Sequence, residues 1–194
     1  MSKSISDRKK LLEWLESEVP TTLQSIADGV TGGLKDGGVV FACGNGGSAS
    51  QAEHFVAELV GRFKRDRKAL RAQALSANTS TVTAIANDYG FENVFARQLD
   101  GVAKRGDCLV AFSTSGTSPN VVNACRAAHE SGMRVFVFTG QSYGPMAASC
   151  DVALAVPSTD TAVVQEVHFT ALHIICEIVE KALFSASDTP SQNV

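Results

Sequence analysis

Residues 39–48 read VVFACGNGGS, an apolar run that leads into a turn with three glycines. Strands that are buried on both faces of a parallel sheet read as continuous apolar runs of this kind. Glycine lets the backbone bend sharply and approach a ligand closely, and residues 49–63, ASQAEHFVAELVGRF, have helical composition. The stretch therefore predicts a buried strand that passes through a tight turn into a helix.

Similar apolar runs recur along the chain. They occupy residues 39–43, 72–76, 108–113, 134–139 and 152–156, with longer segments of helical composition between them. Strands that alternate with helices predict an α/β fold in which helices cover both faces of one parallel sheet. We therefore expect a doubly wound three-layer sandwich with a central parallel five-stranded sheet.

Helices are predicted at both ends of the chain. Apolar residues recur at helical spacing from 7 to 34 with a break at Pro20, which predicts two N-terminal helices, and 162–184 predicts one long closing helix. No internal repeat or linker divides the 194 residues, so we expect one domain. Its predicted parts are N-terminal helices (7–35), an α/β core (36–185) and a disordered tail (186–194), which together make up 1–194.

Composition excludes several classes of protein. The formal net charge is −3, so no overall cationic field attracts nucleic acid or an anionic membrane. The five cysteines are widely spaced without a CxxC pair, which favours reduced thiols over disulfides or a cysteine-based zinc site. We find no signal peptide and expect no segment of membrane-spanning length, so the sequence predicts a cytoplasmic protein without a membrane partner.

Two loops have the composition of anion-binding sites. Gly44 to Ser48 lie between a predicted strand and a helix, where free backbone N–H groups attract an anion, although a plain turn with Ser48 as N-cap is the alternative. Residues 113–118 read STSGTS, and their hydroxyl groups can bind a phosphate without a cation. A flexible linker is the alternative for this second loop. Neither loop matches a Walker A or GxGxxG motif, so we expect no nucleotide cofactor.

Titratable side chains gather in two predicted helices. His54 and Glu58 are four residues apart and share one helix face, where they can bind a metal ion, transfer protons or form a plain surface pair. Gln165, Glu166 and two histidines, His168 and His173, interrupt the apolar closing helix. Helical period alone aligns Glu166 with His173 better than Gln165.

Four motifs together resemble a known family. FACGNGGSASQAEHF, AIANDYGF, AFSTSGTSPNVVNA and QEVHFTALHIICEIVE are similar, in order and spacing, to the sugar isomerase (SIS) domain, and within it to the sedoheptulose 7-phosphate isomerases, or phosphoheptose isomerases. The resemblance extends from residue 7 to residue 184. It implies the SIS version of the α/β fold predicted above.

The resemblance also implies a site. One zinc ion per subunit would be bound by His54, Glu58, Gln165 and His173, and the catalytic pair would be Glu58 and His173. The implied substrate-binding residues are Asn45, Gly46, Gly47, Ser48, Glu58, Asn87, Asp88, Ser113, Thr114, Ser115, Ser118 and Gln165.

A few neighbouring positions are less defined. Arg62 matches an arginine of the family or is a solvated cap in the run RFKRDRK, whose other charges we expect at the surface. Some members carry an acidic residue three positions before the glutamine. In this chain that position is Ala162, and the acidic residue nearest to it is Asp160. We interpret His168 as a hydrogen-bonded interface histidine.

The function implied is that of an aldose-ketose isomerase, which converts sedoheptulose 7-phosphate to D-glycero-D-manno-heptose 7-phosphate for activated-heptose biosynthesis. The implied assembly is a homotetramer with active sites built from neighbouring subunits. Two alternatives remain: an SIS isomerase for another phosphosugar, and a non-catalytic SIS regulator that binds the replication initiator. Such regulators lack the glutamate and the final histidine of the isomerase set, whereas this chain has Glu58 and His173.

Overall fold

A computed structural model describes residues 2–184, so the predicted disordered tail at 186–194 lies outside the described residues. Five parallel strands form one sheet in the order β2-β1-β3-β4-β5. The strands are β1 (Val40–Cys43), β2 (Ala72–Ala74), β3 (Cys108–Ser113), β4 (Arg134–Thr139) and β5 (Val152–Ala155). The predicted sheet is therefore confirmed, although β2, at the sheet edge, ends two residues earlier than expected.

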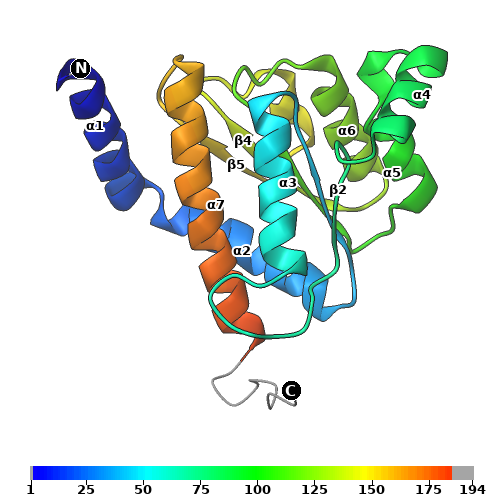
Figure 1. Ribbon diagram of the computed structural model, residues 1–194, viewed down its shortest axis with the longest axis horizontal. Helices are drawn as coiled ribbons and strands as arrows, with labels where there is room; N and C mark the ends of the chain where they lie inside the picture. Colours follow the sequence, from blue (N-terminus) through cyan, green and yellow to red (C-terminus); the bar gives the residue numbers. More distant parts are fainter. Residues whose placement is uncertain (1, 185–194) are drawn as a thin grey trace.

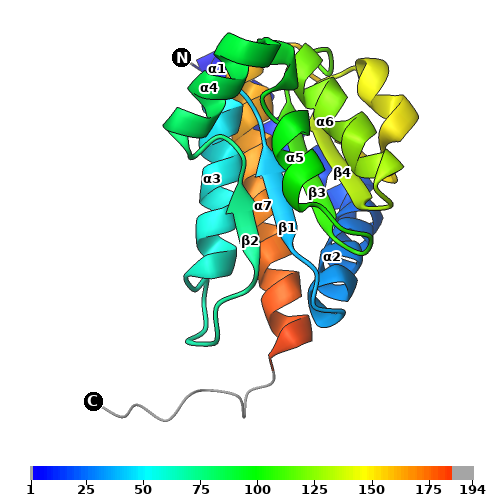
Figure 2. The ribbon, with the colours of Figure 1, turned by 90° about the vertical axis from the view of Figure 1, so that its right-hand side faces the viewer.

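Helices cover both faces of this sheet (Figures 1 and 2). They are α1 (Ser2–Glu18), α2 (Pro20–Lys35), α3 (Gly47–Val60), α4 (Thr79–Tyr89), α5 (Ala96–Val102), α6 (Pro119–Glu130) and α7 (Thr161–Leu183), with 3-10 turns η1 (Phe91–Asn93) and η2 (Gly144–Ser149). Pro20 begins α2 because proline fits the first turn of a helix, where its missing N–H needs no partner. The doubly wound three-layer fold is thus confirmed.

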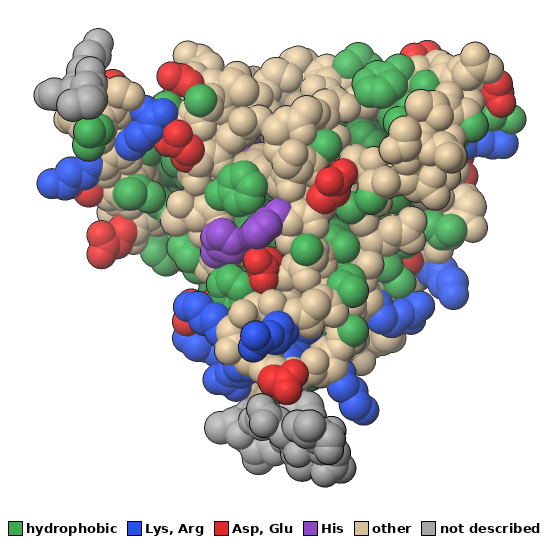
Figure 3. Space-filling view, viewed as in Figure 1, with side chains coloured by type: hydrophobic (Ala, Val, Ile, Leu, Met, Phe, Trp, Pro, Cys, Tyr) green, Lys and Arg blue, Asp and Glu red, His purple; other side chains and the backbone are tan. Residues whose placement is uncertain are grey.

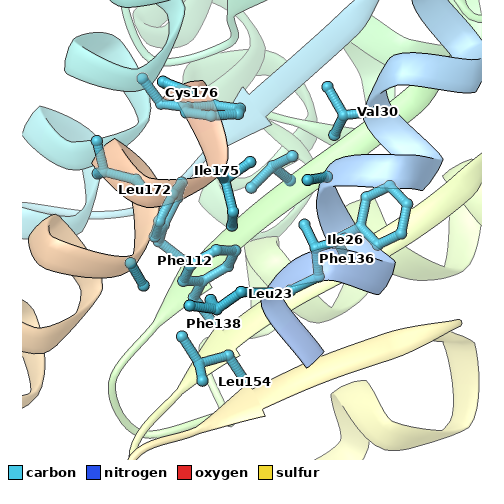
Figure 4. Close-up of a cluster of buried hydrophobic side chains, with 14 of the residues drawn as sticks. Leu23, Ile26, Val30, Phe112, Phe136, Phe138, Leu154, Leu172, Ile175 and Cys176 are labelled. Carbon is cyan, nitrogen blue, oxygen red and sulfur yellow. The ribbon is translucent and has the colours of Figure 1, made fainter. Parts of the chain in front are cut away.

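Alternate residues of the central strands fill two separate cores. From β3, Val110 and Phe112 pack against α2, α3 and α7, whereas Leu109 and Ala111 pack against α5 and α6. Figure 4 shows the first of these cores, with Phe112 among side chains from α2, α7 and the neighbouring strands. Both faces of the strand are buried, which is why its sequence is continuously apolar.

The closing helix corrects one expectation. We expected no segment of membrane-spanning length, but α7 has 23 residues and contains an 18-residue window with a mean hydropathy of 1.4, enough to cross a membrane by length and composition. Half of its most apolar window is buried inside the fold, however, and α7 packs against α2 and α3. Its apolar character is therefore that of a core helix.

Candidate active site

Helices α3 and α7 bring three of the predicted site residues together. His54 Nε2 lies 3.1 Å from Glu58 Oε1 and 3.0 Å from His173 Nε2. The ligand atoms of all three residues lie within 4.8 Å of one another, although His173 is 119 residues from His54 in the sequence. In the space-filling view, histidine side chains meet an acidic side chain at the surface over these two helices (Figure 3).

The cluster is only partly exposed. The side chains of His54 and Glu58 are 40% and 20% exposed, and the ring of Phe63 stacks on His173 with centroids 5.7 Å apart. Burial lowers the pKa of His173, a positive charge on His54 lowers it further, and Glu58 opposes both effects. His173 is thus favoured in its neutral form, in which an imidazole nitrogen can accept a proton or bind a metal ion.

The distances leave His54 Nε2 with two close neighbours. An imidazole nitrogen carries either one proton or one lone pair, so it can make one well-aligned hydrogen bond and not two. Two imidazole nitrogens and a carboxylate oxygen at this separation can together hold a metal ion. The His54–Glu58–His173 cluster can therefore act as a metal site or as a set of proton carriers.

Gln165 lies beside the glycine turn, near the start of α7. A Cβ added to Gly47 would lie 2.5 Å from Gln165 Nε2, so only glycine leaves room for this amide. Gln51, which the sequence reasoning did not identify, donates from Nε2 to the Gln165 backbone carbonyl at 2.7 Å. Glu166 points elsewhere, because its carboxylate pairs with Arg8 on α1 at 2.6 Å. The side chain adjoining the glycine turn is therefore that of Gln165.

The hydroxyl groups after β3 form a connected loop. Ser113 Oγ donates to Ser118 Oγ at 3.2 Å, and Ser115 Oγ accepts from the Thr117 backbone N–H and from Thr117 Oγ1. Thr114 and Ser115 also line a hollow of about 330 Å³. The predicted phosphate-binding hydroxyls thus lie together at the carboxyl end of a central strand, where ligands bind in open α/β sheets.

A pair of asparagines joins the two loops. Asn45 and Asn120 exchange two side-chain hydrogen bonds of 2.8 Å, and Asn120 is 2% exposed. Gly46, the residue before α3, has φ 54°, a left-handed conformation that favours glycine. Ser48 is buried in the first turn of α3 and Gly46 occupies the N-cap position, so Ser48 is not the N-cap that the plain-turn alternative assigned to it.

Three of the positions singled out in the sequence are exposed in the single chain. Asn87 and Asp88 are exposed on α4, where the Asn87 amide donates to the Asp88 carboxylate at 2.7 Å. Helix α4 lies next to α5, at the opposite side of the molecule from α7 (Figure 1). Arg62 is exposed just after α3. Within the described part of one chain, these residues make no hydrogen bond to the cluster or to either loop.

Two expectations from the sequence are wrong, and a third residue, Asp160, takes a structural role. His168 is not at an interface: it is fully buried against Phe112 and Phe138, with Nε2 3.0 Å from the Thr139 carbonyl oxygen. The run RFKRDRK is not wholly at the surface, because Arg67 is 7% exposed. Asp160 caps α7, where its side chain accepts from the backbone N–H groups of residues 162 and 163.

Comparisons with known proteins identify relatives of this chain. The family model described as "SIS domain" matches residues 5–140. Phosphoheptose isomerase from Pelobacter propionicus is 44% identical over 181 residues, which cover 93% of this chain and 96% of that protein. Phosphoheptose isomerase from Roseiflexus sp. is 48% identical over 170 residues, 88% of this chain and 86% of that one.

The chain is also similar to solved structures of phosphoheptose isomerases. The phosphoheptose isomerase of Neisseria gonorrhoeae superposes with a TM-score of 0.87 at 38% identity, over 92% of this chain and 96% of that one. The phosphoheptose isomerase of Francisella tularensis superposes with a TM-score of 0.89 at 33% identity, over 93% of this chain and 96% of that one. The NanR protein of Vibrio vulnificus, solved with ManNAc-6P, gives 0.65 at 16% identity over 93% of this chain and 61% of that one, and shows a shared fold alone.

Proposed function

The chain belongs to the phosphoheptose isomerases of the SIS-domain family, and from this we propose that it converts sedoheptulose 7-phosphate to D-glycero-D-manno-heptose 7-phosphate. One observation carries the proposal. Glu58 and His173, which come from different helices, lie with His54 in one cluster. This acid and imidazole set is what separates the isomerases from the regulator alternative.

The reaction moves one proton between C1 and C2 and another between O1 and O2, through an enediol. A carboxylate beside the carbonyl can remove the carbon-bound proton, and Glu58 is the carboxylate of the cluster. His173, favoured in its neutral form, then transfers the proton between the two oxygens. Glu58 thus transfers the proton bound to carbon, and His173 transfers the proton bound to oxygen.

Zinc fits the same residues. Two ligands of one tetrahedral zinc ion, each bound at about 2.0–2.1 Å, lie roughly 3.3 Å apart. The separations of 3.0 and 3.1 Å from His54 Nε2 are close to that value, and the family resemblance implies Gln165 as the fourth ligand. When bound, zinc would polarise the substrate carbonyl and stabilise negative charge on the enediol oxygen.

The other end of the sugar would be bound by the hydroxyl loop. Ser113, Thr114, Ser115 and Ser118 provide hydrogen bonds to the phosphate, and Asn45 to Ser48 line the approach from the first strand. The substrate would therefore span from the end of β3 to the face shared by α3 and α7.

We further propose a cytoplasmic homotetramer whose subunits complete one another's sites. Asn87 and Asp88 are predicted substrate-binding residues but are exposed on α4 in the single chain, and a neighbouring copy that covers them would bring them into a shared site. Exposed apolar side chains suit such contacts: Ile5 on α1 is 63% exposed and Phe91 after α4 is 54% exposed.

The test is an isomerase assay on sedoheptulose 7-phosphate with the wild-type protein and Glu58→Gln. Glutamine keeps the shape of glutamate but cannot accept a proton, so we expect turnover to be abolished with an unchanged circular dichroism spectrum. Glu53→Gln is the matched control, because it removes one carboxylate from the exposed face of the same helix. Retained activity in Glu58→Gln refutes the proposal. Loss of activity with a chelator, restored by zinc, would support the metal site.

A further inference from the structure

Behind the cluster, Arg67 and Glu180 form a buried ion pair. Arg67 Nε lies 3.1 Å from Glu180 Oε1, and the two side chains are 2% and 4% exposed. Apolar residues of similar volume often replace such a pair without loss of stability. Stability alone is therefore a weak reason for two charges at this place, and their hydrogen bonds point to another role.

The guanidinium of Arg67 holds the end of α3. Its Nη2 donates to the Glu58 carbonyl oxygen at 2.7 Å, and its Nη1 donates to the carbonyl oxygens of Leu59 and Gly61 at 2.8 and 3.2 Å. The last carbonyl groups of a helix have no partner within the helix. Arg67 supplies that partner and fixes the helical turn that carries Glu58.

The carboxylate of Glu180 holds the loop that follows α3. It accepts the backbone N–H groups of Phe63, Lys64 and Arg65 at 3.3, 3.0 and 3.1 Å. Phe63 in this loop stacks on the ring of His173, with 13° between the ring planes. One ion pair is thus connected to both members of the proposed catalytic pair, to Glu58 through its backbone and to His173 through Phe63.

We propose that Arg67 and Glu180 are positioning residues for the isomerase reaction, and this inference rests on the function proposed above. The pair sets where Glu58 and His173 stand relative to each other. The donors of Arg67 are all directed at Glu180 and at backbone carbonyl oxygens, so the pair acts without touching the sugar. The phosphate-binding hydroxyls after β3 are not among its partners.

Two variants test the proposal. Arg67→Lys keeps the positive charge but loses the planar fork that reaches several carbonyl oxygens at once. Glu180→Gln keeps the shape and one acceptor oxygen. Because a misplacement of about 1 Å at a reacting group can lower a rate about 100-fold, we expect kcat to fall about 10- to 100-fold in Arg67→Lys and less in Glu180→Gln. KM for sedoheptulose 7-phosphate should stay within about two-fold, because the phosphate contacts are unchanged.

Glu177→Gln is the matched control. Glu177 also lies on α7 and pairs with Lys64 of the same loop, but these side chains are 34% and 60% exposed and make no contact with Glu58. We expect its kcat to equal that of the wild type. All assays are run well below the melting temperature of each variant, so that the folded fraction is the same.

The outcomes are distinct. A folded Arg67→Lys or Glu180→Gln protein with kcat within two-fold of the wild type overturns the proposal. A rise in KM at unchanged kcat, or an equal fall in kcat in Glu177→Gln, overturns it as well. If Arg67→Lys does not fold, Glu180→Gln decides. A wild-type protein that does not isomerise the substrate would instead refute the proposed function.

Discussion

Acidification should destabilise the protein through one buried histidine, His168. Its Nε2 faces the Thr139 carbonyl oxygen, which can only accept, so Nε2 carries the proton of the neutral ring. The other nitrogen, Nδ1, is buried without a hydrogen-bond partner among the described residues. Protonating Nδ1 would create a buried cation whose new N–H has no acceptor. Burial therefore lowers the pKa of His168 to about 4, against the opposing effect of the Thr139 bond.

The direction and the size of the change in the free energy of unfolding follow from the pKa of His168 in the folded and the unfolded state. In the unfolded chain a histidine has a pKa of about 6.5, so between pH 6.5 and pH 4 the unfolded state binds a proton that the folded state does not. The free energy of unfolding must then decrease as the pH falls through this range and level off below it. The difference of about 2.5 pKa units amounts to about 3.4 kcal/mol in total, of which about 2 kcal/mol is lost between pH 7.5 and pH 5.

The assay is urea unfolding at pH 7.5 and pH 5.0, at one protein concentration, for the wild type and His168→Gln. Glutamine can donate to the Thr139 carbonyl oxygen but does not titrate. The wild type should lose about 2 kcal/mol more than the variant between the two pH values, because all other titrating groups contribute equally to both. An equal loss in the two proteins would refute the reasoning.

Three glycine substitutions give further predictions. Gly29→Ala should lower the free energy of unfolding by about 1–3 kcal/mol, because its Cβ would overlap the Phe136 ring. Gly32→Ala on the same helix has open space around the new Cβ and should raise the free energy of unfolding by about 0.5–1 kcal/mol. Thermal unfolding distinguishes the two, and equal effects would contradict the packing argument. Gly47→Ala should displace the Gln165 amide and weaken zinc binding with little effect on folding, as measured by competition with a chromophoric chelator. Unchanged affinity would show that Gln165 does not bind the metal.

The fold could be read from the sequence because buried parallel strands and amphipathic helices leave local patterns. The apolar run of β3 was predicted at its observed bounds, and Pro20 marked the start of α2. The edge strand β2 was predicted too long because its pattern is weaker at an edge, where the strand pairs on one side only. Local sequence patterns thus predict which segments are strands and helices, but the end of a strand at the sheet edge is predicted less well.

The site was predicted in part. His54 and Glu58 share a helix face by spacing, but only the family resemblance joined them to His173, which the fold brings within hydrogen-bond distance. Arg67 and Glu180 are 113 residues apart, and a basic run normally lies at the surface, so no local pattern indicated their pairing. The one available signal was Glu180 itself, a carboxylate within an apolar stretch of the closing helix.

The reciprocal hydrogen bonds between Asn45 and Asn120 have a consequence for recognition. They link the turn after β1 to the start of α6 without any ligand. Under the proposed function, a sugar phosphate that binds between these linked turns loses little conformational entropy in ordering the protein, so more of its contact energy is expressed as affinity.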